Sequence, residues 1–255
     1  MHLADLCERF DDRLRTDDFA DLDASANGLQ VGPEGKEIDH VAFAVDAAVE
    51  TAERAVEANA DLLVTHHGLI WGGLSRVTGR EYRRIAALIE NDLALYVSHL
   101  PLDAHPSLGN AAGLADLLDL ADREPFGALG AEHIGCRGVA RDPFSPADLA
   151  TLLDRDLANG ARGVQVLDFG PEEIERVAIL TGSGADWFDE AVEGGVDAFV
   201  TGEGKHQVYH EAKEAGMHVF LAGHYATETF GVRSLEALAA EWGLETTFID
   251  APTGL

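Results

Sequence analysis

Two adjacent histidines, His66 and His67, follow the apolar run DLLVT at residues 61–65. Within a strand, neighbouring side chains point to opposite faces, but past a strand end both imidazoles can turn toward one cavity. A single ion rarely takes two sequence-adjacent imidazoles without backbone strain, whereas two ions about 3.5–4 Å apart would accept one ring each. The pair therefore predicts a metal site, with two chance structural histidines as the alternative.

A second candidate group consists of His224 and Glu228, which are four residues apart. If a helix begins near His224, both side chains project from one helical face, and Gly223 lets the backbone turn tightly into it. Asp103 adds a hard oxygen ligand in a loop after the apolar run at 93–98. Mixed imidazole and carboxylate donors suit Zn, Mn, Fe or Ni and do not single one out.

The elements that must position these residues alternate between strands and helices. Apolar runs at 40–45, 61–65 and 93–98 predict buried strands, and the segments between them have helical patterns. Such alternation predicts an α/β fold with parallel pairing and right-handed crossovers. Sites in open parallel sheets form at the carboxyl ends of strands, which is where the candidate ligands occur.

A second α/β series follows the Gly- and charge-rich stretch 121–135, which is a candidate domain boundary. It opens with a short strand at 135–140, followed by a helix start at Ser145, whose hydroxyl can cap the helix. Further strands are predicted at 163–169, 176–182, 197–202 and 218–223, then a helix from Tyr225 to about Trp242 and a final strand. We therefore predict two similar α/β domains with mostly parallel sheets and a metal site between them: residues 1–125 plus 225–255, and residues 126–224.

The composition is strongly acidic, with 46 Asp and Glu against 18 Lys and Arg and a net charge of −28. Only Lys36, Lys205 and Lys213 are lysines, and the acids are dispersed along the chain. This pattern indicates adaptation to a salt-rich cytoplasm, where ions screen the self-repulsion; an acidic partner-binding protein is the alternative. Without a basic stripe to neutralise phosphates, broad nucleic-acid binding is disfavoured.

The remaining sequence features favour a cytoplasmic protein. No apolar stretch reaches the roughly 20 residues needed to span a bilayer. Residues 1–19 carry acids throughout and lack the basic start and apolar core of a secretory signal. Cys7 and Cys136 show no metal-ligand spacing, so we expect two reduced thiols at or near the core.

Six segments together resemble a known family. They are NGLQVG (27–32), AVDAA (44–48), THHGLI (65–70), SHLPLDA (98–104), TGEGKH (201–206) and AGHYATETFGV (222–232). In this order and separation they are similar to the dinuclear metal-centre hexameric protein family. That family is also called the GTP cyclohydrolase type 2-like or NGG-one-interacting-factor-three-like family.

The resemblance implies two divalent metal ions per subunit. It implies that His67 and Asp103 hold one ion, that His66 and His224 hold the other, and that Glu228 bridges both. His99 matches a family histidine near the metals.

The TGEGKH segment resembles one that lines the same cavity, although a capped helix start is the alternative. We predict Glu203 and Lys205 as cofactor-binding residues, with Lys205 as a phosphate partner. His99 and His206 are candidates for general acid or base, because a neutral imidazole near a metal can move protons.

The resemblance also implies two similar α/β domains in a ring-shaped homohexamer. Some relatives carry an inserted third domain, but the stretch 121–135 is too short to hold one. Pro101 stands where many relatives have a polar residue, which puts the carry-over of a substrate in doubt.

Two classes of function remain open at this point. The first is a metal-dependent hydrolase that acts on a nucleotide or related small molecule through metal-activated water. The sequence has no P-loop, so the link to GTP rests on the resemblance alone. The second is a non-catalytic metal-loaded ring that serves as an adaptor, a metal chaperone or a nucleic-acid scaffold.

Overall fold

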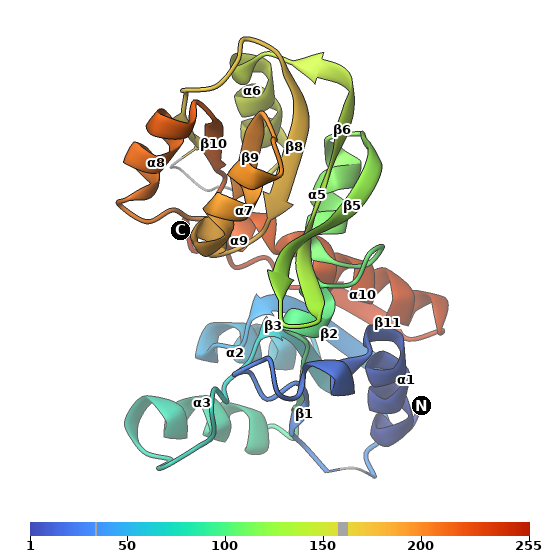
Figure 1. The fold of residues 1–255 in the computed structure, drawn as a ribbon. Coiled ribbons are helices and arrows are strands. Elements are labelled where there is room, and N and C mark those ends of the chain that lie inside the picture. The colour runs from blue at the N-terminus through green and yellow to red at the C-terminus, as the bar shows by residue number, and fades with distance from the viewer. Residues whose placement is uncertain (34, 158–162) are drawn as a thin grey trace. The chain divides into compact units, whose positions relative to one another are not determined.

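The computed structural model describes residues 1–33, 35–157 and 163–255. The chain forms two compact units, one of residues 1–102 with 231–251 and the other of residues 103–230 with 252–255 (Figure 1). Each unit has its own sheet, and parallel strands form the middle of both sheets. The predicted α/β class with two α/β halves is confirmed.

The first unit is built on a five-stranded sheet in the order β1-β4-β3-β2-β11. Its strands are β1 (Gly28–Val31), β2 (His40–Asp46), β3 (Leu62–His67), β4 (Ala94–Val97) and β11 (Glu245–Phe248). All neighbours are parallel except the antiparallel edge strand β1. Its helices are α1 (Leu3–Leu14), η1 (Thr16–Phe19), α2 (Val49–Glu57), α3 (Gly79–Ile89) and most of α10 (Thr229–Glu241), and α4 (Leu100–Asp103) leads out of the unit.

The central strands of this sheet are buried along almost their whole length. Ala42, Leu63 and Leu95 are fully buried and belong to one apolar cluster on the sheet. Strands covered on both faces need continuous apolar runs, which is why the sequence pattern predicts them correctly. Their polar residues are therefore concentrated at the strand ends.

The predicted end of the second strand at Thr65 is wrong, because β3 continues through His67. His67 pairs with Asp46 of β2, and the Ala47 amide donates to the His67 carbonyl at 2.8 Å. This added rung of the parallel ladder extends the strand. Both histidines therefore have strand backbone, not loop backbone.

The second unit is built on a six-stranded sheet in the order β5-β6-β8-β9-β10-β7. Its strands are β5 (Leu120–Leu129), β6 (Glu132–Phe144), β7 (Gln165–Leu167), β8 (Ile174–Leu180), β9 (Ala198–Thr201) and β10 (His218–Leu221). Its helices are α5 (Asn110–Leu117), α6 (Pro146–Asp156), η2 (Gly184–Trp187), α7 (Phe188–Glu193), α8 (Val208–Ala215) and α9 (His224–Thr227). Strands β8, β9 and β10 are parallel, and the flanking strands are antiparallel.

Several local predictions can be compared with this unit. Ser145 caps α6, because its hydroxyl accepts the Asp148 amide at 3.1 Å, as predicted. The stretch 121–135 is not irregular, because it forms most of the β5–β6 hairpin, and residue 125 lies inside β5. The helix predicted from Tyr225 is interrupted at Glu228, which separates α9 from α10.

Within the described residues, no helix combines the length and apolar character needed to cross a bilayer.

Candidate metal centre

Polar side chains of the first unit gather at the carboxyl ends of its parallel strands. Asp46 ends β2, His66 and His67 end β3, and His99 follows β4 by two residues. The carboxyl ends of neighbouring parallel strands lie along one sheet edge, so these side chains meet although they are far apart in the sequence.

His66, His67 and His99 form what we call the imidazole cluster. Their ring centroids are 4.7 Å apart for His66 and His67, 5.0 Å for His66 and His99, and 5.7 Å for His67 and His99. One potential ligand atom from each ring lies within 4.8 Å of the other two. His66 is buried and the other two are partly buried.

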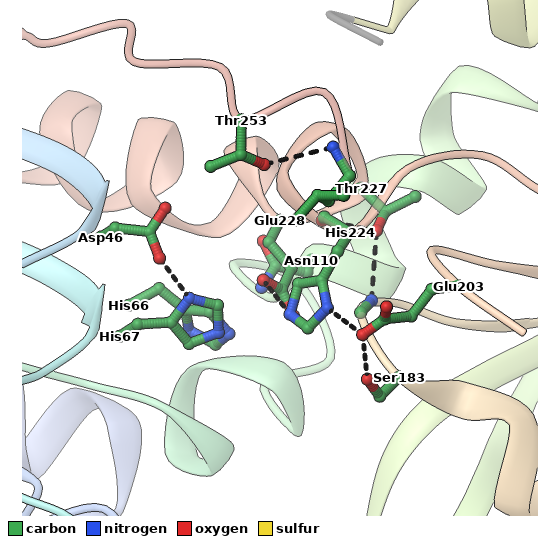
Figure 2. A network of polar contacts seen from close by, with 12 residues as sticks. Asp46, His66, His67, Asn110, Ser183, Glu203, His224, Thr227, Glu228 and Thr253 are labelled. Atoms are coloured by element: carbon green, nitrogen blue, oxygen red, sulfur yellow. Dashed lines mark hydrogen bonds and ion pairs between the residues drawn. The ribbon is translucent and has the colours of Figure 1, made fainter. Parts of the chain in front are cut away.

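The first two rings of this cluster are oriented through Nδ1. His66 Nδ1 lies 2.9 Å from the Ser98 carbonyl oxygen. His67 Nδ1 lies 2.8 Å from Asp46 Oδ1 (Figure 2). Because a carbonyl and a carboxylate can only accept, Nδ1 must carry the proton in each ring. Nε2 is then the atom with a lone pair for a ligand.

The third ring, His99, is oriented by a buried carboxylate. Its Nδ1 lies 2.9 Å from Asp23 Oδ1 and 3.1 Å from Oδ2, and the Asp23 side chain is only 2% exposed. Asp23 also accepts the Leu100 amide at 3.0 Å and the Asn27 side-chain amide at 2.8 Å. Burial alone would raise the pKa of Asp23. The hydrogen bond with His99 and the charge of that ring lower it more, together with the bonds from Asn27 and Ser25, so the pKa of Asp23 lies below its usual range.

The second unit gathers polar residues at the carboxyl ends of β8, β9 and β10. Glu203 follows β9, and His224 and Glu228 follow β10. His224 Nδ1 lies 2.7 Å from Glu203 Oε1, and its Nε2 lies 3.1 Å from Glu228 Oε2. Figure 2 shows Glu203 between His224 and Ser183, whose hydroxyl donates to the same carboxylate. We call Glu203, His224 and Glu228 the carboxylate cluster.

The two neighbouring carboxylates favour the protonated form of His224, and a metal ion bound at this ring would take the place of that proton. Burial alone would lower the pKa of His224, but the hydrogen bonds and charges of Glu228 and Glu203 raise it to about 9. The same geometry lowers the pKa of Glu203, mainly through its bonds with Ser183 and His224. The cluster thus concentrates negative charge around one imidazole.

Two glycine loops pack directly against the carboxylate cluster. A Cβ atom at Gly182, where φ is +60°, would overlap Glu228 Oε1. A Cβ atom at Gly202 would lie 2.8 Å from the His224 Cα atom and 2.6 Å from the Gly182 carbonyl oxygen. The loops after β8 and β9 therefore require glycine to bring the backbone this close.

The structure also fixes the surroundings of the other predicted residues. Asp103 Oδ1 accepts a hydrogen bond from the Asn110 side chain at 2.8 Å within the second unit. Lys205 forms an ion pair with Asp186. His206 is exposed, and its ring lies 6.4 Å from that of His210. The roles predicted for these residues stay predictions.

A family model matches almost the whole sequence. The match to Duf34/NIF3 (NGG1p interacting factor 3) covers residues 1–254. The chain belongs to the DUF34/NIF3 family. A Halobacterium salinarum relative, named GTP cyclohydrolase 1 type 2 homolog, is 59% identical over the full length of both chains. An Archaeoglobus fulgidus relative with the same name is 41% identical, also over the full length of both.

Solved DUF34/NIF3-like structures share the fold. Protein ybgI is 35% identical, with a TM-score of 0.90 and full coverage of both chains. TTHA1606 from Thermus thermophilus is 38% identical, with a TM-score of 0.89 and full coverage of both chains. The resemblance derived from the sequence motifs is therefore confirmed at the level of family and fold.

The donor set of this DUF34/NIF3 chain fits transition-metal ions. Histidines that ligate metals almost always give their other ring N–H to a carboxylate or a carbonyl, and all three rings of the imidazole cluster do so. The carboxylate cluster supplies hard oxygen donors beside a further imidazole. The residues therefore fit a metal site.

Sequence reasoning missed the residues that orient these rings. Asp46 directly follows the strand predicted at 40–45 and lies in one of the family-like segments, so its position gave a usable signal. Asp23 lies in a loop 76 positions before His99, and no spacing rule connects the two. Ser98 contributes a backbone carbonyl, which the identity of its side chain does not reveal.

Proposed function

We propose that this protein is a metal-dependent hydrolase that acts on a nucleotide or a related small molecule. The observation that supports it is the imidazole cluster, in which acceptors fix Nδ1 of all three rings and potential ligand atoms of the three lie within 4.8 Å of one another. The name shared by the curated relatives, GTP cyclohydrolase 1 type 2 homolog, supports a nucleotide as the substrate class.

In this proposal the chain holds two divalent ions, drawn from Zn, Mn, Fe or Ni. His67 and Asp103 hold one ion, His66 and His224 hold the other, and Glu228 joins them. When bound, the ions lower the pKa of water and polarise a carbonyl or phosphoryl oxygen. The anchored tautomers and the carboxylate donors described above support this assignment.

The proton transfers in this proposal belong to His99. Asp23 fixes its Nδ1 proton, so Nε2 is the atom that accepts a proton from attacking water and returns it to the leaving group. His206 is the second candidate for this role. Glu203 positions His224 through the 2.7 Å contact, and Lys205 is the cation we assign to a substrate phosphate.

Replacing Glu228 by Gln tests the proposal, because the amide keeps the shape but removes the negative charge between the two ions. We expect the variant to lose metal, measured by elemental analysis, and to lose hydrolysis of the substrate found by screening. The exposed Glu241→Gln variant is the matched control and should keep both.

The screen should cover nucleotides, phosphoesters and cyclic amides with metal-supplemented protein. If fully metallated protein turns over no member of these classes, the hydrolase proposal fails and a non-catalytic ring becomes the better description. If no metal binds after supplementation, the metal site itself is refuted.

We also propose that the chain assembles into a cytoplasmic homohexameric ring without a membrane or nucleic-acid partner. The family resemblance supports the ring, and the lack of a basic stripe supports the absence of a nucleic-acid partner. Light scattering should then give a mass of six 27.2 kDa chains. A monomeric mass at high salt would contradict it.

A further inference from the structure

Trp71 lies beside the imidazole cluster and is unusually open to solvent. Its residue surface is 44% exposed, although burial of an indole is among the largest gains available to a folding chain. Its ring centroid lies 4.9 Å from that of His99, with the ring planes at 75°, and 6.3 Å from that of His67. The exposed indole thus borders the proposed reaction site.

The backbone around Trp71 is fixed by a second loop of the same unit. The Ala26 amide donates to the Ile70 carbonyl at 3.0 Å, and the Gly72 amide donates to the Ala24 carbonyl at 2.7 Å. These two bonds flank an antiparallel bridge between Ser25 and Trp71. The exposure of Trp71 is therefore built into a paired backbone and does not result from a loose loop.

The Gln30 side chain also holds the backbone of the two residues that precede Trp71, and we call this contact the clamp. Its Oε1 accepts the Leu69 amide at 2.9 Å and the Ile70 amide at 3.2 Å, and its Nε2 donates to the Ala26 carbonyl at 2.7 Å. A Cβ atom at Gly68 would overlap the Gln30 amide, so this contact requires glycine there. The clamp pre-organises the loop, which reduces the entropy cost of binding a ligand.

The indole has no polar group left to offer. Its Nε1 donates to the Gly68 carbonyl at 3.1 Å, which leaves the aromatic surface as its means of recognition. An aromatic ring held rigidly at a solvent-exposed position can stack against the flat ring of a ligand, since every nucleobase has a π face. Aliphatic or sugar-phosphate ligands would gain much less from it.

We propose that Trp71 is the stacking platform for a planar nitrogen heterocycle, such as a purine, placed next to the imidazole cluster. The assignment rests on the proposed function in taking that cluster as the reaction site. The proposed function already names a nucleotide, and this assignment adds the residue that recognises its base, because Trp71 selects a ligand with a flat heteroaromatic ring.

The test measures binding by the full chain loaded with Zn²⁺, using guanosine and GTP as planar probes and ribose 5-phosphate as the non-planar comparison. Stacking on an aromatic side chain changes affinity by about 5- to 150-fold. We therefore expect Trp71→Ala to weaken guanosine and GTP binding at least about 5-fold, and Trp71→Phe to retain most of the affinity. Binding of ribose 5-phosphate should not change.

Tyr82→Ala is the matched control, because Tyr82 is an exposed aromatic residue (57%) of the same unit, on α3. It should bind both probes like the original chain. Intrinsic fluorescence gives an independent readout: guanosine should quench the original chain, and the quench should vanish in Trp71→Phe although binding persists.

Three results would overturn the assignment. The first is a metal-loaded chain that binds neither planar probe. The second is unchanged affinity in Trp71→Ala. The third is a Trp71→Ala variant whose oligomeric mass falls together with its nucleotide affinity, which would make Trp71 a subunit contact together with exposed Leu74 and Val77. The hydrolase proposal is judged separately by turnover. Binding of a planar probe without turnover would contradict only the hydrolase proposal. Turnover of a non-planar substrate without binding of a planar probe would contradict only the role of Trp71.

Discussion

His99 depends for its orientation on a carboxylate 76 positions earlier in the chain. An imidazole exists in two neutral tautomers, and the acceptor at Nδ1 selects the one that leaves Nε2 basic. Asp23 makes this choice with a side chain that is almost wholly buried. The chemistry assigned to His99 is therefore as dependent on Asp23 as on the ring itself.

Asp23→Asn should uncouple this pair without removing either side chain. The amide can donate to Nδ1, which moves the ring proton to Nε2 and removes the basic lone pair. We expect catalytic turnover to fall by roughly 10²- to 10⁴-fold, the usual contribution of a general acid or base.

The nitrogen chemical shifts of His99 should report the exchanged tautomer. The exposed Asp21→Asn variant should leave both turnover and shifts unchanged. Normal shifts in Asp23→Asn would contradict the argument.

The two thiols provide a prediction about pH. Burial, with some help from the charge of Asp11, raises the pKa of Cys7 to about 12, and burial raises the pKa of Cys136 to about 11. Folding therefore favours the protonated thiols. Their contribution to stability is complete below the usual thiol pKa near 9 and is lost as the pH rises from there toward 11–12.

At pH 8 both thiols should react slowly with a disulfide reagent in the folded protein, and rapidly in denaturant. Urea titrations should also give a free energy of unfolding that falls between pH 9 and 11. A burst of two reactive thiols in the folded protein would contradict the burial argument.

At the scale of elements, the site depends on loops that follow parallel strands. The loops after β8 and β9 approach the carboxylate cluster so closely that only glycine fits at Gly182 and Gly202. Loop composition at a strand end is therefore part of the candidate metal site, although glycine has no ligand atom.

Gly182→Ala should displace Glu228 and lower the metal content of the purified protein. Gly195→Ala is a close control, because Gly195 has a similar backbone (φ +64°) but open space where its Cβ would lie. Both variants bear the cost of an alanine in the left-handed region, about 1–2 kcal/mol. Only Gly182→Ala should lose metal; equal metal content in the two variants would show that the clash is relieved elsewhere.

The elements also show what the sequence could predict. The buried strands β2, β4, β9 and β10 follow from unbroken apolar runs, because strands covered on both faces leave that pattern. The edge strand β5 carries the exposed residues Asp122, Arg123 and Glu124, so its pattern is that of a loop. Strand β3 extends through His67 because of pairing with Asp46, which is a tertiary contact and leaves no local pattern.

The candidate site likewise contains some residues that the sequence could predict and others that it could not. His66, His67, His224 and Glu228 were identifiable because their types and strand-end positions are unusual in combination. Asp23, Gln30 and Trp71 make contacts between segments that are distant in the sequence, and such contacts exist only once the sheet has brought these segments together. Sequence reasoning finds donors more readily than the residues that orient them.

At the scale of the whole molecule, the dominant feature is a net charge of −28 on 255 residues. Like charges on one surface destabilise the compact state unless salt screens them. The screening length falls from about 10 Å at 0.1 M salt to about 3 Å at 1 M. The same chain should therefore be markedly more stable in concentrated salt.

Thermal unfolding in rising KCl measures this effect directly. We expect the midpoint temperature to increase steadily from 0.1 M toward the molar range, because the screening length then falls below the distance between surface charges. Sucrose at matched osmolality is the control, because it is excluded from the surface but does not screen charge, so it should recover only part of the increase. A midpoint that is the same at low and high KCl, or that sucrose raises as much as KCl does, would mean that charge repulsion does not limit stability and that the acidic surface serves a partner instead.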